Sequence, residues 1–225
     1  AFGGTIGDSV SALASRHEDQ IIRSRANPIS TSGAIAVLSG NLAPRGAVIK
    51  HAAADPALGT HEGRAVVFDS VQDMTERLDD DSLDIVAQDI LVLRNAGPKG
   101  APGMPEAGYI PIPRHLARQG VKDMVRISDA RMSGTAFGTI VLHITPEAAD
   151  GGPLAVVRTG DRIRLDVPNR RLDLLVDDAE LALRMQSIPA APPAPRRGYA
   201  QLYDRHVTQA DDGVDFDFLM GVADE

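Results

Sequence analysis

The sequence contains no cysteine and no tryptophan among its 225 residues. Without cysteine, these residues supply no disulfide, no thiol nucleophile and no thiolate ligand for a zinc or iron–sulfur centre. Aromatic residues make up only 4% of the chain, which leaves few rings on which the bases of a single-stranded nucleic acid would stack. Any chemistry carried here falls to hydroxyl, carboxylate, imidazole, amino or guanidinium groups.

Positive charge is also scarce. Lys and Arg number 23 against 31 Asp and Glu, the formal net charge is −8, and no basic run occurs. General binding to nucleic acid or to an anionic membrane surface, which needs clustered Lys and Arg, is therefore not expected. The sequence has no apolar run of about 18 residues and no charged-then-apolar leader. We expect neither a transmembrane helix nor a signal peptide, and a cytoplasmic location.

The residues that are present indicate a globular chain rich in turns. Hydrophobic residues make up 43% and charged residues 24%, with 21 Gly and 15 Pro. These values favour one sizeable β-rich domain with some helix. Residues 1–30 are weakly patterned and read as a linker or a truncated edge, with one short helix expected between Val10 and Ile22.

Short apolar runs bounded by turn residues predict the strands. These runs lie at residues 34–38, 47–50, 64–68, 90–93, 124–127, 139–144, 154–157, 161–167 and 171–176. Capping residues predict helices at 71–78, 113–120 and 177–185, and a helix start at Thr145-Pro-Glu147. Together they predict a β-rich α+β fold, a barrel-like (swivelling β/β/α) domain of about eight strands with short flanking helices.

The order of these segments suggests how the chain is organised. We expect the barrel domain at 31–187, a Pro-rich extended spacer at 188–198 and a C-terminal tail at 199–225 that docks on another surface.

Two segments carry the candidate chemistry. Small residues with two glycines join two strand patterns at residues 129–138, so the hydroxyls of Ser133 and Thr135 are expected on a tight, exposed connection. The same pattern also fits a turn without function. Residues 94–106 hold three glycines and three prolines, which predicts a long shaped loop, a class of segment that often carries function.

Five motifs in order make the sequence similar to one known family. They are Gly40-Asn-Leu-Ala-Pro44, Asn95-Ala-Gly-Pro-Lys-Gly-Ala-Pro-Gly-Met-Pro-Glu106, Ile127-Ser-Asp-Ala-Arg-Met-Ser-Gly-Thr135, Ile144-Thr-Pro-Glu-Ala148 and Arg171-Leu-Asp-Leu-Leu-Val176. Over about residues 27–219 the chain resembles the C-terminal domain of the dihydroxy-acid and sugar-acid dehydratases. The Ala-Arg-Met form of the central motif and the segment ending at Pro113 resemble the pentonate (arabinonate or xylonate) branch.

The resemblance implies a reaction and its cofactors. A 2,3-dihydroxy acid loses water through an enol to give a 2-keto-3-deoxy acid. An iron–sulfur cluster acts as Lewis acid on the leaving 3-hydroxyl, and Mg²⁺ holds the carboxylate and the 2-hydroxyl. Because the proton at C2 is weakly acidic and hydroxide leaves poorly, the reaction needs a positioned base and electrophiles.

The resemblance also implies roles for residues of this chain. The base falls on Ser133, which needs a neighbouring cation to lower its pKa; Thr135 would orient the substrate or the serine, and Glu106 would be the Mg²⁺ ligand. Lys99, Arg131 and His206 are weaker candidates for substrate binding. Asp129 and Arg131 flank the serine and are candidates to pair with each other, whereas His143, inside a strand, reads as core packing.

The resemblance implies that the cluster cysteines and the remaining Mg²⁺ ligands, including a modified lysine, belong to an N-terminal domain. The hypothesis is therefore a C-terminal portion of a dehydratase, inactive alone, that works with that domain or with a partner chain and forms a homo-oligomer in the full enzyme. Two alternatives stay open: a stand-alone module that binds a sugar acid or a partner without catalysis, and a fragment of a branched-chain dihydroxy-acid dehydratase. The sugar acid and the cluster type, [2Fe-2S] or [4Fe-4S], are also open.

Overall fold

The computed structural model describes residues 3–11, 21–188 and 193–221. The chain divides into two compact units, Ala1–Gly33 and Ala34–Glu225. In the first unit, helix α1 spans Ile6–Ser11 and its side chains are exposed. The helix expected between Val10 and Ile22 overlaps α1 only at its start, and residues 12–20 lie outside the described residues.

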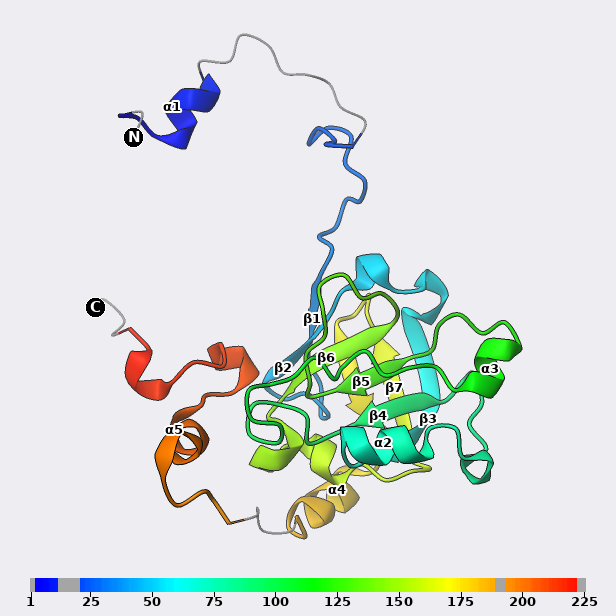
Figure 1. Ribbon diagram of the computed structural model, residues 1–225. Helices are drawn as coiled ribbons and strands as arrows, with labels where there is room; N and C mark the ends of the chain where they lie inside the picture. Colours follow the sequence, from blue (N-terminus) through cyan, green and yellow to red (C-terminus); the bar gives the residue numbers. More distant parts are fainter. Residues whose placement is uncertain (1–2, 12–20, 189–192, 222–225) are drawn as a thin grey trace. The chain divides into compact units, whose positions relative to one another are not determined.

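The second unit is built around one eight-stranded mixed sheet (Figure 1). Its strands follow one another in the sheet in the order β1-β2-β6-β5-β4-β3-β7-β8. Their bounds are Ala36–Leu38 for β1, Gly46–Ile49 for β2, Thr60–Phe68 for β3, Ile90–Leu93 for β4, Arg126–Ser128 for β5, Ile140–Thr145 for β6, Arg162–Asp166 for β7 and Arg171–Leu174 for β8. Strands β3, β4, β5 and β6 run parallel, and the remaining pairs are antiparallel.

The two edges of this sheet meet, so that the sheet is nearly closed as a barrel. Ser39, directly after β1, forms a parallel bridge with Arg171 at the start of β8. The side chain of Asn41 completes the seam: its Nδ2 donates to the Leu174 carbonyl at 2.8 Å, and its Oδ1 accepts from the Leu174 N–H at 2.7 Å. Closure leaves few unpaired strand edges. The expected barrel-like fold with short helices is thereby confirmed.

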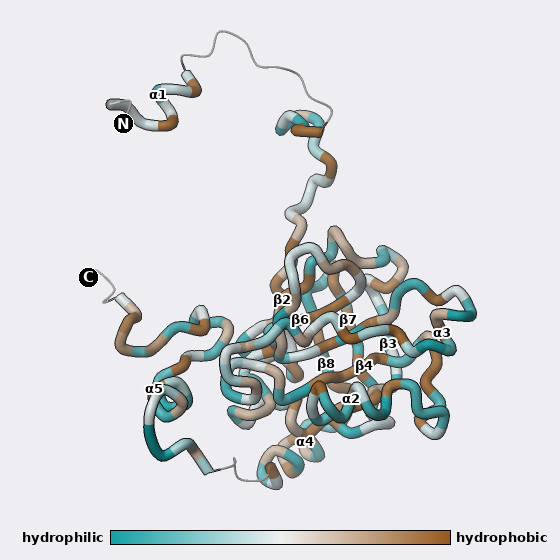
Figure 2. Tube along the Cα trace, in the orientation of Figure 1, coloured by the Kyte–Doolittle hydropathy of each residue, from teal (hydrophilic) through white to brown (hydrophobic). Residues whose placement is uncertain are grey.

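The parallel strands are buried on both faces over most of their length, and β4 accordingly has an uninterrupted apolar sequence. In β4, Ile90 and Val92 pack inside the barrel, whereas Leu91 and Leu93 belong to a second cluster with Met74 of α2. Figure 2 shows apolar residues concentrated along the barrel strands and hydrophilic residues on outer helices such as α2. Because successive side chains of a strand point to opposite faces, one short run serves both cores.

Short helices lie between and after the strands. The α-helices of this unit are α2 Val71–Arg77, α3 Arg114–Arg118, α4 Asp178–Met185 and α5 Gly198–His206. Single-turn 3₁₀ helices occupy His51–Ala53, Pro56–Leu58, Asp81–Leu83, Ala148–Asp150, Pro153–Val156, Ala210–Asp212 and Asp217–Leu219. Ser70 caps α2 as its sequence indicates, because its Oγ accepts from the Asp73 N–H at 3.1 Å. In the described residues, no helix combines the length and the hydrophobicity that a membrane crossing requires.

Two expected elements are wrong. Residues 154–156 lie in a 3₁₀ helix, Pro153–Val156, instead of a strand at 154–157, because Pro153 begins the turn. The Arg94 guanidinium binds the carbonyls of Leu154, Ala155 and Val157, the residue after this helix. Thr145 does not cap a helix, since it is the last residue of β6. Glu147 is the N-cap of the single turn that begins at Ala148.

A β-bulge interrupts the pairing of β2 with β6. Gly46 pairs with Thr145 and Val48 with Leu142, so β6 advances three residues where β2 advances two. His143 takes up the difference with a left-handed backbone, at φ 53°. Bulges of this kind redirect a side chain out of the regular strand pattern, and the bulge therefore sets where the His143 imidazole points.

Candidate active site

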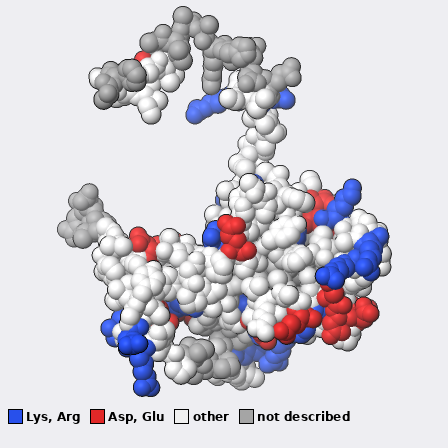
Figure 3. Space-filling view, viewed as in Figure 1, with Lys and Arg blue, Asp and Glu red and all other residues white. Residues whose placement is uncertain are grey.

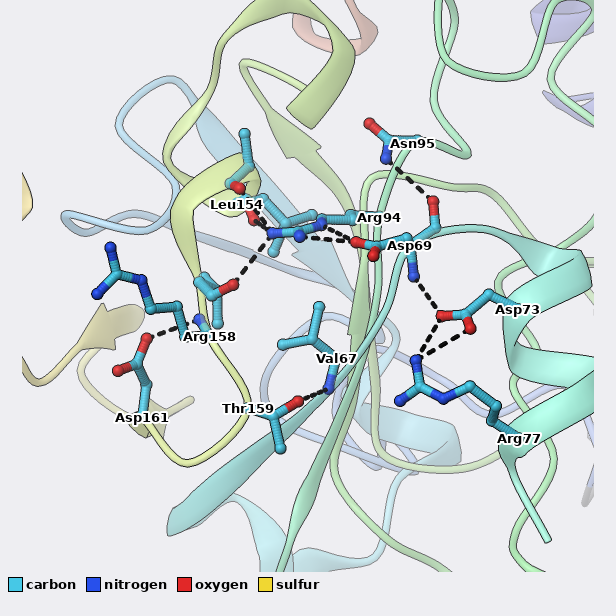
Figure 4. A network of polar contacts seen from close by, with 12 residues as sticks. Val67, Asp69, Asp73, Arg77, Arg94, Asn95, Leu154, Arg158, Thr159 and Asp161 are labelled. Carbon is cyan, nitrogen blue, oxygen red and sulfur yellow. Dashed lines mark hydrogen bonds and ion pairs between the residues drawn. The ribbon is translucent and has the colours of Figure 1, made fainter. Parts of the chain in front are cut away.

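Three loops leave the carboxyl ends of the adjacent parallel strands β4, β5 and β6. They begin at Arg94, Asp129 and Pro146. Ligands of open parallel sheets bind outside the carboxyl ends of the strands, so this end of the barrel is where the loops can act together. Arg94 fixes the first loop at its base (Figure 4). Its guanidinium lies between Asp69, directly after β3, and the carbonyls of residues 154, 155 and 157, in and directly after the 3₁₀ helix Pro153–Val156.

The two hydroxyls of the second loop are in contact. Ser133 Oγ lies 3.0 Å from Thr135 Oγ1, and the Thr135 N–H donates to Ser133 Oγ at 3.4 Å. Lys50, which directly follows β2, donates from Nζ to the Gly134 carbonyl at 2.7 Å. The turn therefore presents the partly buried Ser133 hydroxyl and the exposed Thr135 hydroxyl, and an ammonium group binds the residue between them. A nearby cation favours the deprotonated form of a hydroxyl, and the base role that the family resemblance implies for Ser133 requires such a cation.

Glu106, at the end of the first loop, pairs with the second loop. Its Oε1 accepts from Arg131 Nη1 at 2.9 Å, and both side chains are about half exposed. Arg131 Nε also donates to the Met104 carbonyl at 2.6 Å. The expected pairing of Asp129 with Arg131 is wrong, because Arg131 is turned toward Glu106. The fold thus joins two residues that are 25 positions apart in the sequence.

Asp129 is instead buried, with 1% of its surface exposed. Its carboxylate accepts from the backbone N–H groups of Asn95, Ala96 and Ala148, at 2.9 to 3.1 Å. Burial raises the pKa of Asp129 to about 6, whereas these three hydrogen bonds act in the opposite direction and the nearby Glu147 acts with burial. Asp129 therefore ties the starts of the first and third loops to the second.

Glu147, on the third loop, is a second buried carboxylate, also 1% exposed. It accepts from the backbone N–H groups of Lys99 and Gly100 at 2.9 Å and from Gln209 Nε2 at 2.7 Å. The sequence pattern does not indicate this role, because Thr-Pro-Glu resembles a helix start and charged residues are mostly exposed. The one feature of the sequence that points to the buried position of Glu147 is that its motif directly follows a β-branched strand.

The weaker candidates occupy separate pairs. Lys99 Nζ binds Asp150 of the third loop. His206, in α5, has its Nδ1 2.8 Å from Asp217 Oδ1, and its ring contacts Phe218 edge to face. The structure therefore brings Ser133 together with Thr135, and Glu106 with Arg131, whereas Lys99 and His206 have their own acidic partners.

His143 adds an imidazole behind the second loop. The residue is half-buried, its Nδ1 is buried without a hydrogen-bond partner, and its backbone N–H donates to the Ala130 carbonyl at 3.1 Å. Burial, and secondarily the charge of Arg131, lowers the pKa of His143. A lowered pKa favours the neutral ring, so His143 offers a neutral imidazole next to Arg131. The bulge of β6, which the sequence pattern did not show, places it there.

The residues available to a metal are few in this chain. Among the described residues, no group of three or more His, Asp or Glu is arranged to hold a metal ion. Glu106 offers a hard carboxylate oxygen, the type of ligand that Mg²⁺ takes singly or in pairs together with water and substrate oxygens. The chemistry of Glu106 therefore fits one ligand of a shared Mg²⁺ site. A thiolate-bound cluster does not fit these residues, because the sequence has no cysteine.

Comparison with known proteins places this arrangement in a family. Residues 20–214 match the family model of the dihydroxy-acid/6-phosphogluconate dehydratase C-terminal domain. The chain is 52% identical over 219 residues to an L-arabinonate dehydratase of Rhizobium leguminosarum, covering 97% of this chain and 38% of that protein. It is 51% identical over 215 residues to a 6-deoxy-6-sulfo-D-gluconate dehydratase of Pseudomonas putida, covering 94% and 37%.

A more distant relative is a dihydroxy-acid dehydratase of Carboxydothermus hydrogenoformans, which is 40% identical over 215 residues, covering 95% of this chain and 38% of that protein. The chain thus spans less than two fifths of the length of these curated relatives. The family model covers most of the chain, including all three loops and the barrel strands that hold them. The chain belongs to the dihydroxy-acid/6-phosphogluconate dehydratase family, as its C-terminal domain.

Proposed function

We propose that this chain provides the proton-abstracting part of a sugar-acid dehydratase, with Ser133 as the base. The observation that supports the proposal most directly is the contact of Ser133 with Thr135 on a loop that also carries Arg131, the partner of Glu106. Substrate would sit over the ends of β4 and β5, in reach of both loops. Lys99, Arg131 and His206 are proposed as groups that bind the acid or its hydroxyls.

The proposed reaction follows from the acidity of the groups involved. Ser133 Oγ, as an alkoxide, takes the proton from C2 of a 2,3-dihydroxy acid while the C3–O bond breaks, and the proton then passes from Ser133 to the leaving hydroxide, which gives water and restores the alkoxide. The resulting enol then loses its hydroxyl proton to water and takes up a proton from water at C3, which gives the 2-keto-3-deoxy acid. A serine hydroxyl is too weakly acidic to form the alkoxide unaided. The Lys50 ammonium, bound to the adjacent Gly134 carbonyl at 2.7 Å, favours it electrostatically.

The cofactors of this proposal divide between this chain and residues outside it. Glu106 would hold Mg²⁺ as one ligand, and the bound ion would bind the substrate carboxylate and 2-hydroxyl. The remaining Mg²⁺ ligands and all cluster cysteines would come from the region that corresponds to the rest of the longer relatives, on the same polypeptide or on a partner chain. We propose that the complete enzyme is a homo-oligomer.

A pentonate is the substrate that we propose. Its support is the higher identity to the relative named L-arabinonate dehydratase, 52%, than to the dihydroxy-acid dehydratase, 40%. The two closer relatives, the L-arabinonate dehydratase and the 6-deoxy-6-sulfo-D-gluconate dehydratase, are both named for sugar acids, in which the carboxylate is followed by two hydroxyl-bearing carbons, C2 and C3. A branched-chain dihydroxy acid has the same reacting carbons without the further hydroxyls, and it is the second substrate class to assay.

The deciding experiment is a pair of assays with L-arabinonate and D-xylonate in the presence of Mg²⁺. The 225-residue chain alone is expected to show no turnover, and substantial activity would contradict the division of ligands. In the complete enzyme, Ser133→Ala should reduce kcat by about 10²–10⁴-fold, the usual contribution of a positioned base. Ser9→Ala, in the exposed helix α1, is the matched control and should leave kcat unchanged.

A module that binds sugar acids without catalysis would give a different result. It would be stabilised by the sugar acid through mass action, and this shift would be seen by thermal denaturation. The complete enzyme would then show no turnover in either the wild-type or the Ser133→Ala form. Equal kcat values for wild type and Ser133→Ala would also reject Ser133 as the base.

A further inference from the structure

The C-terminal segment, which we define as residues 198–219, reaches the loop that carries Glu106. Gln209 of this segment is buried, with 5% of its surface exposed, and it binds Glu147 of the third loop. Tyr203 donates from its hydroxyl to the Pro98 carbonyl at 3.0 Å. Arg45, near the start of β2, pairs with Asp211 and Asp212 of the same segment. The segment is thus attached to the barrel on both sides of Gln209.

Gln209 and Glu147 form a closed, two-point contact. Gln209 Nε2 donates to Glu147 Oε1 at 2.7 Å, and Gln209 Oε1 accepts from the Glu147 backbone N–H at 2.9 Å. An amide side chain offers one donor and one acceptor side, and both are used here. A carboxylate at position 209 would lose the donor and place a second negative charge against Glu147.

The other contacts of Glu147 fix the first loop. Its two oxygens accept from the backbone N–H groups of Lys99 and Gly100, and this part of the loop would otherwise leave those groups without a protein partner. Gly97 lies so close that an added Cβ would meet Glu147 Oε2 at 2.6 Å. The loop can therefore approach Glu147 only with a glycine at this point. Glu106 follows six residues after these hydrogen bonds.

We propose that Glu147 and Gln209 are a buried pair of positioning residues, which sets the conformation of the Gly- and Pro-rich loop and so places Glu106. The C-terminal segment thereby becomes part of the active site through Gln209, without touching substrate. The part of this inference that concerns Glu106 and Mg²⁺ rests on the proposed function. The structural part, the control of the loop by Gln209, does not.

Amide hydrogen exchange of the chain tests the structural part without any assay of activity. In Gln209→Ala, exchange at the Lys99 and Gly100 amides should rise by about tenfold or more, because Glu147, their common acceptor, loses the two buried hydrogen bonds that join it to Gln209. Exchange at Leu91 and Val92 of β4 should not change. Gln186→Ala, at an exposed glutamine after α4, is the matched control. Unchanged exchange at the loop amides in Gln209→Ala would overturn the proposal.

A charge swap distinguishes pairing from general packing. Gln209→Glu faces two carboxylates toward each other and should expose the loop amides at least as much as Gln209→Ala. The double variant Glu147→Gln with Gln209→Glu restores one donor opposite one carboxylate and should recover most of the protection. Failure of the double variant to recover any protection beyond that of Gln209→Glu would contradict the pairing.

The functional part is tested in the complete enzyme. Gln209→Ala should lower kcat by about tenfold and raise the Mg²⁺ concentration that gives half of the maximal rate, with a smaller change in KM for the sugar acid. The double variant should recover kcat in parallel with loop protection. Loop exchange that rises while kcat and the Mg²⁺ requirement stay at wild-type values would overturn the positioning role. A failure of Ser133 as the base would leave the exchange results unaffected, so the two failures can be told apart.

Discussion

At the scale of single residues, the candidate site contains two kinds of side chain. Some are at least partly exposed and are proposed to react, and others are buried and hold the loops in place. Ser133, Thr135 and Glu106 are exposed or partly exposed, whereas Asp129 and Glu147 are each 1% exposed and bind backbone N–H groups. A carboxylate whose oxygens accept several backbone hydrogen bonds stabilises loop conformation in the same way as a helix cap. The burial of these two groups is therefore explained by the loops that they organise.

Lys50 gives a prediction about the pH dependence of the reaction. Lys50→Met removes the positive charge beside the Ser133 turn. The limb of the pH–rate profile that is assigned to Ser133 should therefore move to higher pH, with its midpoint raised by about one unit. Lys50→Arg retains the positive charge and should show little of this shift. The measurement is the pH profile of kcat/KM in the complete enzyme. Lys122→Met, at an exposed lysine before β5, is the control, and an identical profile for Lys50→Met would exclude the electrostatic role.

Asp129 gives a prediction about stability. Its folded-state pKa, about 6, lies above the ordinary value of 3.8, so the folded protein binds this proton more tightly than the unfolded chain does. The stabilising contribution is complete below about pH 3.8 and is lost as the pH rises through 6. At about 1.4 kcal/mol per pKa unit, the change is about 3 kcal/mol.

Asp129→Asn supplies the reference for this measurement, because asparagine does not titrate. The free energy of unfolding of the wild-type chain minus that of Asp129→Asn should fall by about this amount, 3 kcal/mol, between pH 3 and pH 7. Urea denaturation at several pH values measures it. A difference that stays constant over this range would show that the pKa of Asp129 is not raised.

The sequence predicts only those contacts that are local. Ser133 and Thr135 are two positions apart, so a turn brings their hydroxyls together whatever the fold. The pairing of Arg131 with Glu106 and that of Gln209 with Glu147 bridge 25 and 62 positions, and no local pattern marks them. The incorrect expectation for Arg131 had the same origin, since it assigned the nearest acidic residue as its partner.

At the scale of elements, apolar runs predicted where strands occur but not how they pair. Each of the eight strands overlaps an expected run, because short β-branched segments between turn residues strongly favour the strand conformation. Most of the run at 154–157 lies in the 3₁₀ helix Pro153–Val156, where the distant Arg94 binds backbone carbonyls. The pairing of β3 with both β4 and β7 depends on contacts that the sequence does not display.

The barrel seam gives a prediction for an element. Asn41 supplies both side-chain hydrogen bonds to Leu174, and its own side chain is partly buried. Asn41→Ala leaves the Leu174 N–H and carbonyl without these partners and should reduce the free energy of unfolding by about 2–3 kcal/mol. Chemical denaturation of the chain measures this loss. Asn169→Ala, at an exposed turn, should change stability by no more than about 0.5 kcal/mol, and a comparable loss in both variants would refute the role of the seam.

At the scale of the whole molecule, charge is well dispersed while several large apolar side chains are exposed. Figure 3 shows acidic and basic side chains interspersed on the face in view. Val37 of β1 and Phe137 of the second loop are 56% and 64% exposed. Exposed apolar residues are common singly, whereas groups of them mark surfaces that other proteins cover.

The chain on its own should therefore self-associate. Static light scattering is expected to give an average mass that rises with concentration, because exposed apolar groups of different copies meet. Val37→Glu, on the outward side of β1, should lower the mass at a given concentration, and Lys122→Glu serves as a control for added negative charge. A mass that equals 23.8 kDa at every concentration would contradict this expectation.

The parallel run of β4, β5 and β6 has a consequence for protein engineering. Adjacent strands lie about 4.8 Å apart, so the roots of the three loops are held at fixed spacing by backbone hydrogen bonds that do not depend on the loop sequences. Chimeras in which one loop is exchanged between relatives should keep this framework, provided that the incoming loop carries the glycine, aspartate or glutamate that corresponds to Gly97, Asp129 or Glu147. We expect that the contribution of this domain to substrate preference can then be tested one loop at a time on a common barrel.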